Sequence, residues 1–417
     1  MPVVLVCTEA FLPLARAVAR QEGFDALPVV SIPHPIGGVE AGALNDAVLA
    51  AVDGIAERLL VTPAAEEEAG PNEVMRDAPS DVSGFLAFAM DQGWGDGLPL
   101  VPPAVELVEA GVAATGLDAE TSLGSVPPSN RGATVHAIVA NAVMAGCSPQ
   151  VMPVVMAAVR GALQPPMNMQ ALTTTTHPVT PLVIVHGPMV DELGFNAGPS
   201  TFGQGNRANA TVGRALRLIL HNVGGAKPGE TDRATHGSPT KYSYCIAENA
   251  AESPWESFHA HRGCGDARGA VTLVGGEGPH NINDHGSTDA DGLLHTIAGT
   301  IGQLGHNNLY LRGQMLLVIS PEHAAVIARD GYDRRGVQEA IRDRARTSVA
   351  GVSAGNLERF ARISPQLFDP PPEDGVIPLL DSADDLLVLV AGGPGKHSVF
   401  VPTFGSTEAV TVPVLTP

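Results

Sequence analysis

Short runs of β-branched and other apolar residues alternate with segments of helical spacing along the first sixty residues. "VVLVCTEAF" (residues 3–11) and "LPVVSIPHPIGG" (27–38) predict strands, while "LPLARAVARQEG" (12–23) and "LNDAVLAAVDGIAERLL" (44–60) predict helices. Strands that are joined through a helix usually run parallel. The order therefore predicts a small parallel β-α-β-α unit over residues 1–60.

The composition changes after this unit. "TPAAEEEAGPNEVMRDAPSD" is acidic and rich in Pro and Ala, which is typical of a linker, and we assign residues 61–81 to it. The main domain is then expected over residues 82–417. It contains "ATVHAIVANAVMAG" (133–146), which is apolar nearly all round and predicts a buried helix, and "NRANATVGRALRLILHNVGG" (206–225), which predicts a helix that ends at two glycines.

A short apolar strand, a sharp turn and an amphipathic or glycine-rich continuation recur at Val3, Leu182 and Met315. "DLLVLVAGGPGKHSV" (385–399) follows the same plan as far as its glycine-rich turn. The fold class predicted is α/β: a small parallel β-α-β-α unit followed by a larger Gly/Ala-rich α/β domain. In such a fold, functional groups gather at the carboxyl ends of the strands.

Net charge and composition limit the classes of partner that the protein is expected to bind. The chain has 417 residues and a net charge of −20, which disfavours nucleic acid and anionic membrane surfaces. Its apolar N-terminus lacks the basic region of a signal peptide, and no apolar run is long enough to span a bilayer. The four cysteines form no CxxC pair, so we expect reduced thiols and a cytoplasmic protein. Few charges and abundant Ala and Gly fit a homo-oligomer.

Cys147 directly precedes "SPQVMPVVMAAVRGAL", a predicted helix with Ser148 as its N-cap. Unpaired backbone N–H groups and the helix dipole favour a thiolate at such a position, which would suit a nucleophile or a metal ligand. The alternative is a small buried hydrophobic side chain between two packed helices.

The glycine-rich stretch "GPSTFGQGNRANATVGRA" (198–215) leads into a helix that carries Arg207 and Arg214. Backbone amides at a helix start, together with guanidinium groups, favour an anionic substrate. The stretch is neither a Walker loop nor a dinucleotide fingerprint. In the alternative interpretation it is an ordinary turn whose arginines pair with acidic residues elsewhere. The candidate substrate-binding residues are Gly203, Gly205, Asn206, Arg207 and Arg214.

Histidines concentrate in "SPWESFHAHRGCGDARG" (253–269) and "GPHNINDHGS" (278–287). If the first segment is extended, His259 and His261 point the same way. Imidazole with carboxylate suits zinc, iron or manganese, but the spacings match no strong metal signature. A polar loop whose histidines donate to backbone carbonyls is the alternative. The candidate metal ligands are His259, His261, His280 and His285.

Two further turns carry polar side chains. "GWGDGLPLVPP" (93–103) predicts a rigid loop in which Asp96 is free to act. "AGGPGKHSVF" (391–400) follows a strand, so Lys396 and His397 would face a ligand there or simply cap the turn. The chain has no GxSxG, which leaves a serine-hydrolase mechanism unsupported.

The stretch "VCTEAFLPLARAVARQEGFDALPVVSIPHPIGG" resembles the latter half of the UGSC-type (seleno)protein family, whose members carry a Sec/Cys-Gly-Ser-Cys motif earlier in the domain. That motif is not in this sequence, and Cys7 does not replace it. The resemblance implies that a partner subunit of UGSC type supplies the redox-active pair.

The remainder is similar to the poorly characterised bacterial protein that accompanies UGSC-type domains or is fused to them. "FGQGNRANATVGRALRLIL", "SPWESFH", "HNINDHGS" and "VAGGPGKHS" carry this likeness over most of residues 85–410. It implies a common fold and site. The positions it marks are Cys147, Asn206, Arg207, Arg214, Trp255, His259, Asn281 and His397.

The function predicted is a cytoplasmic enzyme that acts on a small anionic organic substrate by lyase- or hydrolase-type chemistry. Arg207 and Arg214 would hold the anion, with Trp255, Lys396 and His397 beside it. His259 or His285, with Asp284, would move protons. Cys147 would be nucleophile or ligand. Two alternatives stay open: a thiol or selenol redox enzyme that works with a CGSC-bearing partner, and a non-catalytic scaffold of such a complex.

Overall fold

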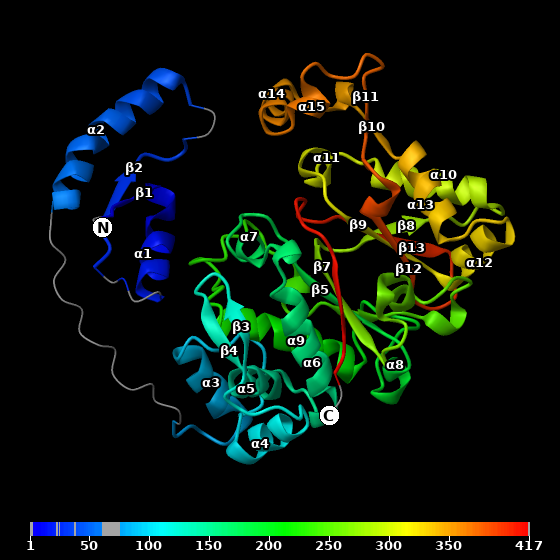
Figure 1. The fold of residues 1–417 in the computed structure, drawn as a ribbon, viewed down its shortest axis with the longest axis horizontal. Helices are drawn as coiled ribbons and strands as arrows, with labels where there is room; N and C mark the ends of the chain where they lie inside the picture. Colours follow the sequence, from blue (N-terminus) through cyan, green and yellow to red (C-terminus); the bar gives the residue numbers. More distant parts are fainter. Residues whose placement is uncertain (1–2, 22–23, 25, 37–38, 61–75, 416–417) are drawn as a thin grey trace.

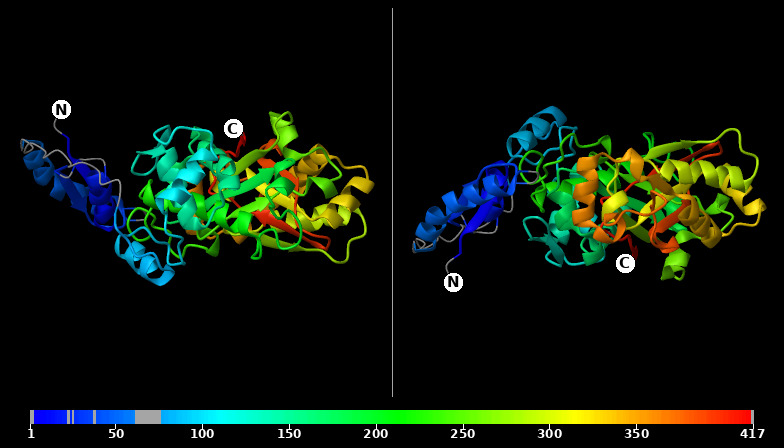
Figure 2. Two further views of the ribbon diagram at one scale, coloured as in Figure 1. Left: turned by 90° about the horizontal axis from the view of Figure 1, so that it is seen from below. Right: turned by 90° about the horizontal axis from the view of Figure 1, so that it is seen from above.

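The N-terminal unit is a parallel pair of strands with two helices. The computed structural model describes residues 3–21, 24, 26–36, 39–60 and 76–415. The unit consists of β1 (Leu5–Thr8), α1 (Leu12–Gln21), β2 (Val29–Ile32) and α2 (Ala41–Leu60). Leu5 pairs with Val29 in parallel register, so the predicted β-α-β-α unit is confirmed. It lies at one end of the molecule (Figure 2).

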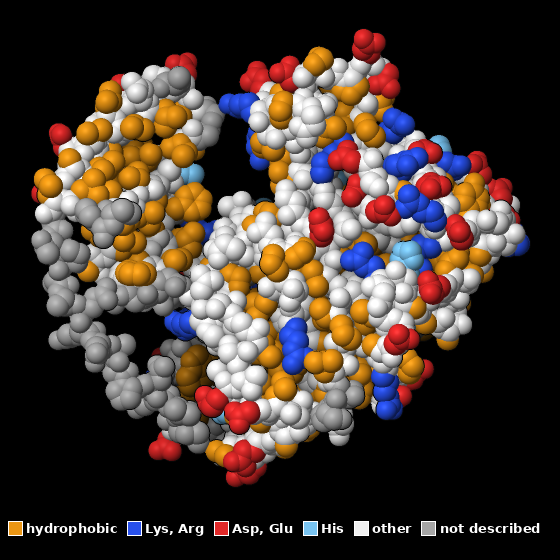
Figure 3. All heavy atoms as spheres, viewed as in Figure 1, with side chains coloured by type: hydrophobic (Ala, Val, Ile, Leu, Met, Phe, Trp, Pro, Cys, Tyr) orange, Lys and Arg blue, Asp and Glu red, His pale blue; other side chains and the backbone are white. Residues whose placement is uncertain are grey.

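This unit buries very little. Among its described residues, the buried members of its hydrophobic cluster are Val30, Ile32 and Ala51. Other apolar side chains on the strand and on the long helix are exposed, among them Val6 (43%) and Leu49 (61%). Figure 3 shows hydrophobic side chains gathered on the face of this unit that is turned to the viewer.

The rest of the described chain is built around two four-stranded sheets (Figure 1). In the first, β5 (Thr180–His186) lies between β6 and β7; it runs parallel to β6 and antiparallel to β7, which pairs in turn with β14. In the second, β9 (Met315–Ile319) runs parallel to β12 and antiparallel to β13. The remaining bounds are β6 (Cys245–Ala247), β7 (Ala270–Gly276), β14 (Val410–Pro413), β12 (Leu386–Val390), β13 (His397–Val401) and β8 (His280–Asn283).

Alternation along the strands explains why the sheets stack. In β5, Val183 and Val185 face helices, whereas Leu182 and Ile184 pack in a cluster shared with β9 and β12 of the other sheet. The outer face of the first sheet is covered by α6 (Met152–Ala162) and α9 (Arg207–Asn222), and α5 (Val135–Ala145) packs on these two helices.

The second sheet is covered on its outer face by α10 (Ala290–Ile301), α12 (Pro321–Arg329) and α13 (Arg334–Arg344). The result is a four-layer order of helices, sheet, sheet and helices. A mixed α/β class is therefore confirmed. None of the described helices is long and apolar enough to cross a bilayer.

Local signals set the helix ends. The Thr134 side chain accepts from Ala137 N at the start of α5, which ends at Gly146 with φ 93°. The Asn206 side chain accepts from Asn209 N at the start of α9. Both helices match the ranges expected from the sequence.

Shorter elements complete the chain. α3 begins at Val82, where the main domain was expected, whereas residues 61–75 of the proposed linker lie outside the described residues. The other elements are η1 (Glu9–Phe11), α3 (Val82–Asp91), α4 (Val105–Ala113), β3 (Ser122–Val126), β4 (Arg131–Thr134), α7 (Met169–Thr173), α8 (Met189–Glu192), α11 (Asn308–Leu311), β10 (Arg346–Ser348), α14 (Ala354–Ile363), α15 (Pro365–Phe368) and β11 (Val376–Pro378).

Candidate functional site

One face of α9 carries Arg214, Arg217 and His221, spaced three and four residues apart. Residues at this spacing lie above one another on a helix. The opposite side of α9 packs through Leu216 and Leu220 into the core of the first half. Apolar packing therefore fixes the direction in which the polar face points.

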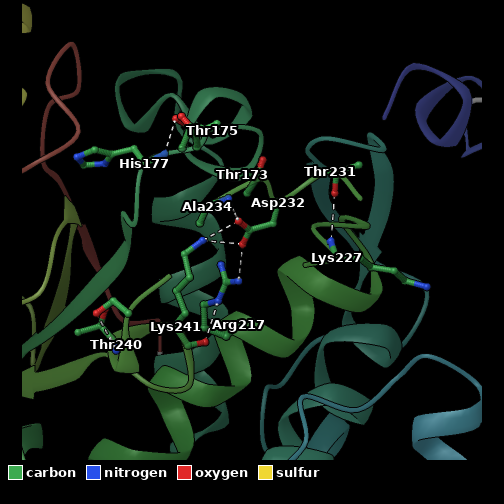
Figure 4. Close-up of polar contacts among 12 residues, drawn as sticks. Thr173, Thr175, His177, Arg217, Lys227, Thr231, Asp232, Ala234, Thr240 and Lys241 are labelled. Atoms are coloured by element: carbon green, nitrogen blue, oxygen red, sulfur yellow. Dashed lines mark hydrogen bonds and ion pairs between the residues drawn. The ribbon is translucent and has the colours of Figure 1, made fainter. Parts of the chain in front are cut away.

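Beneath that face, two cations share one carboxylate (Figure 4). Lys241 Nζ lies 2.8 Å from Asp232 Oδ1 and 2.6 Å from Oδ2. Arg217 Nη2 lies 3.5 Å from Asp232 Oδ2, and its Nε donates to the backbone oxygen of Lys241 at 3.2 Å. Asp232 is 5% exposed and Arg217 9%, so these charges are largely withdrawn from water.

The loop that carries Asp232 is tied down by its own backbone. Asp232 Oδ1 accepts from Ala234 N, and Thr231 Oγ1 accepts from Lys227 N while its hydroxyl donates to Gly225 O (Figure 4). This turn directly follows the glycine pair that ends α9. The acid is therefore held against the helix that carries its arginine partner.

The cluster carries excess positive charge. Burial lowers the pKa of Arg217, and Asp232 opposes this shift. Burial also lowers the pKa of Lys241, with Asp232 opposing it and Arg217 adding to it. Two cations against one carboxylate leave one positive charge for a further partner.

That charge faces a pocket of about 660 Å³, which we call the α9 pocket. A volume of this size suits a small organic ligand. The titratable side chains that line it are Asp96, Arg217, His221, Asp232, His236, Lys241 and Tyr242, with Ser238 beside them.

His221 also lines the α9 pocket. Its Nε2 donates to Gly93 O at 2.9 Å, since a carbonyl can only accept. Burial lowers the pKa of His221, the bond to Gly93 opposes this, and Lys227 and Arg217 lower it further. With Nε2 carrying the proton, the neutral ring has its lone pair on Nδ1, which takes no hydrogen bond from any described residue.

A second pocket of about 540 Å³ lies where β9 and β12 end. It is lined by the glycine-rich turn from Gly392 to Gly395, by Ser320 and His397, and by the loop from Pro199 to Gly203. Gly392 (φ 96°) and Gly395 (φ 148°) have backbone conformations that favour glycine. We call this the glycine-turn pocket. Gly203 and His397, which belong to two different stretches predicted to bind substrate, both line this pocket.

The arginines chosen from the sequence are already engaged. Arg214 donates to both oxygens of Asp96 at 2.8 Å and to the backbone at Pro99 and Leu98. Burial would raise the pKa of Asp96, but Arg214 outweighs it and the pKa is lowered. Arg207 donates twice to Gly146 O. The prediction that Asp96 is free is therefore wrong. For Arg214, the alternative that the arginines pair with acidic residues elsewhere is confirmed.

The expected low pKa of Cys147 is also wrong. The side chain is 7% exposed, and burial raises the pKa of its thiol to about 12, against smaller opposing effects of Thr211 and Arg207. Cys245 is likewise buried, with a raised pKa. Both belong to the hydrophobic core, which for Cys147 is the alternative interpretation given above.

His259 and His261 do not lie on an extended strand. His259 is the N-cap of a π-helical turn at Ala260–Cys264, in which Gly263 has φ 79°. His259 is 6% exposed, and its buried Nδ1 has no hydrogen-bond partner among the described residues. Burial and the neighbouring His186 lower its pKa.

His186 and Glu248 form a pair beside His259 that was not predicted from the sequence. His186 Nδ1 lies 2.7 Å from Glu248 Oε2, and both side chains are fully buried. His186 Nε2 contacts Thr272 Oγ1 at 2.9 Å, and Glu248 Oε1 accepts from Phe258 N. His186 is the last residue of β5, and Glu248 directly follows β6, which runs parallel to β5. Polar residues at the carboxyl ends of neighbouring parallel strands are the sequence signal from which this pair could have been predicted.

Asp284 proves to be a structural acid. Its oxygens accept from Gly286 N, from Ser287 N and Oγ, and from Thr296 Oγ1. Burial would raise its pKa, but these bonds outweigh it and lower the pKa to about 2. Its neighbour His285 is exposed and contacts His397, with the two Nε2 atoms 3.2 Å apart.

The predicted metal ligands do not gather in one place. The described part of the chain contains no group of three or more His, Cys, Asp or Glu side chains arranged to hold an ion. His280 is exposed at the start of β8. A metal on these four histidines together would require rearrangement.

The remaining predicted residues have mainly structural contacts. Gly205 has φ 108°, and Asn206 caps α9 and donates to Gly194 O. Trp255 Nε1 donates to Tyr332 O, and Lys396 Nζ donates to His285 O. Sequence reasoning missed Arg217, His221, Asp232 and Lys241, although Arg217 and His221 follow Arg214 at helical spacing.

Comparison with known proteins places only the first part of the chain. No curated protein and no solved structure matches it. The family model of the UGSC family matches residues 1–61, a range that includes β1, α1, β2 and α2 of the N-terminal unit. The N-terminal region of this protein is therefore similar to the UGSC family.

Proposed function

We propose that this protein is an enzyme that binds a small organic anion in the α9 pocket. The observation that carries the proposal is the unequal charge at one part of its wall, where Arg217 and Lys241 converge on the single carboxylate of Asp232. The second acid of the wall, Asp96, is neutralised by Arg214. A carboxylate or phosphate that entered would complete the neutralisation, through charge-assisted hydrogen bonds that are stronger than neutral ones.

His221 is the proposed general base. It is neutral near pH 7, and the bond from Nε2 to Gly93 O leaves Nδ1 as the proton acceptor. A base beside a bound anion suits removal of a proton from carbon, as in a lyase, or activation of water, as in a hydrolase. Since the thiols of Cys147 and Cys245 have raised pKa values, we assign the chemistry to imidazole rather than sulfur.

Calorimetric titration of the full chain with inorganic phosphate and with succinate tests the anion site. We expect binding that Lys241→Met weakens at least ten-fold and Lys241→Arg largely restores. Arg268→Met is the matched control, because Arg268 is exposed and pairs with Glu192 away from the pocket. Equal affinity of the wild type and Lys241→Met for both probes would refute the proposal.

The base is tested by pH. NMR titration of His221 should give a midpoint below 6.5, its ordinary pKa, because burial disfavours the charged ring. The proton-accepting form would then persist to lower pH than for a free histidine. Assignment of the resonance uses His221→Gln. A midpoint at or above 6.5 would remove His221 as the proposed base.

A role as a subunit is the second candidate. The N-terminal unit has exposed Val6 and Leu49 beside a three-residue core, which favours burial against another chain. A UGSC-type partner would fit the redox or scaffold alternatives, and a second copy would fit a homo-oligomer. Sedimentation of the wild type and of Leu49→Lys tests self-association, which the substitution should weaken.

A further inference from the structure

Two histidines from distant parts of the chain meet at the rim of the glycine-turn pocket. The Nε2 atoms of His285 and His397 are 3.2 Å apart, their ring centroids are 5.0 Å apart, and the planes cross at 74°. Both side chains are exposed, so neither is held there by core packing. The arrangement therefore calls for an account of its own.

We propose that His285 and His397 are two ligands of a divalent transition-metal ion. Two imidazole nitrogens at about 2.05 Å from a tetrahedral ion lie about 3.3 Å apart, with ring centroids about 5.2 Å apart. The observed separations, 3.2 and 5.0 Å, lie close to these values. A straight N–H···N hydrogen bond at the same nitrogen separation would place the centroids about 5.5 Å apart, so the hydrogen bond that is the alternative here would be a bent one.

Asn281 orients His397, one of the two proposed metal ligands. His397 Nδ1 lies 3.0 Å from Asn281 Oδ1, and the amide oxygen can only accept, so Nδ1 carries the proton and Nε2 keeps its lone pair. The antiparallel pairing of β13 with β8 places Val399 opposite Asn281 and thereby fixes this diagonal contact. A second bond that orients a ligating histidine is a regular feature of metal sites.

The remaining coordination positions are open. His397 lines the glycine-turn pocket, so water or a ligand in that pocket would complete the shell. Asp284 is not a candidate ligand, because both of its oxygens accept hydrogen bonds already. The Lys396 ammonium on His285 O lowers the affinity for a cation. Imidazole ligands favour zinc, nickel and copper over magnesium and calcium.

This site does not depend on the α9 pocket, because the two share no lining residue. The test is titration of the full chain, freed of any polyhistidine tag, with Zn²⁺ by calorimetry and with Co²⁺ by visible absorption. We expect about one ion per chain. His285→Gln and His397→Gln should each weaken binding at least ten-fold, and Asn281→Ala less.

His280→Gln is the matched control, since His280 is exposed on the same strand as Asn281. It should leave the affinity unchanged within two-fold. Thermal unfolding of the metal-free variants verifies that each is folded. Absence of binding to the wild type, or binding that His285→Gln and His397→Gln leave intact, would overturn the proposal. Phosphate binding by the same variants tests the α9 pocket separately.

Discussion

Two clusters of buried charge lie around the first sheet, and they differ in how completely they are satisfied. At the ends of β5 and β6, Glu248 meets His186, with Thr272 and Phe258 taking their remaining bonds. Beside α9, Asp232 meets two cations at once. The first cluster lines neither pocket, whereas the second faces about 660 Å³ of open space. A buried cluster whose hydrogen-bonding groups all have partners indicates a structural role. A cluster with one positive charge in excess beside a cavity indicates a site that binds an anion.

The sharpest test of this contrast is Glu248→Gln. It removes the charge opposite a buried imidazole, and we expect a loss of about 3 kcal/mol in the free energy of unfolding, measured with urea. Glu339→Gln, in an exposed pair with Arg335, is the control and should change nothing measurable. A stability equal to that of the wild type would mean that the cluster is not structural.

The same variant has a distinct pH dependence. Burial would raise the pKa of Glu248, but His186 outweighs it and the pKa is lowered from 4.5. The contribution of this carboxylate to stability is therefore present above pH 4.5 and is lost as the pH falls through the lowered pKa. In Glu248→Gln that part of the acid sensitivity should be absent.

Asp232→Asn should act in two directions. Stability should fall by about 2 kcal/mol, less than for Glu248→Gln, because the pocket lets water reach the two unpaired cations. Affinity for inorganic phosphate should rise, since the internal competitor of the anion is removed. Urea unfolding and calorimetry measure the two effects. A parallel loss of both would show that Asp232 positions the cations rather than competing with the ligand.

The smallest effect is expected for Cys147→Ala. Loss of a small buried side chain should cost about 1 kcal/mol in unfolding free energy, and phosphate affinity should not change. Because burial raises the pKa of this thiol to about 12, iodoacetamide should label it slowly in the folded protein at pH 8. Rapid labelling would restore Cys147 as a candidate nucleophile.

Much of the scaffold could be predicted because it depends on local periodicity. A run of apolar residues predicts the strand at Thr180–His186. Helical spacing and capping residues predict the helices at Val135–Ala145 and Arg207–Asn222. The stacking of two sheets was not foreseen, since it depends on strand order. Residues far apart in sequence form those ladders.

The candidate sites were predicted only in part, for the same reason. Gly203, in the loop before α9, and His397, at the start of β13, line the same pocket. Asp232 and Lys241 could not be assigned, because a loop without periodicity brings them to Arg217. His259 and His261 were misplaced because the two-residue period of strands does not apply to a π-helical turn.

The helix α9 holds three separate pieces of the chain through three arginines. Arg207 holds the end of α5 at Gly146, Arg214 holds the loop at Asp96, and Arg217 holds the turn at Asp232. A small slide or roll of this one rod would pull on all three anchorages together. A ligand that moved α9 at the cavity beside its second half would therefore also displace the contact of Arg207 with Gly146 at the start of the helix.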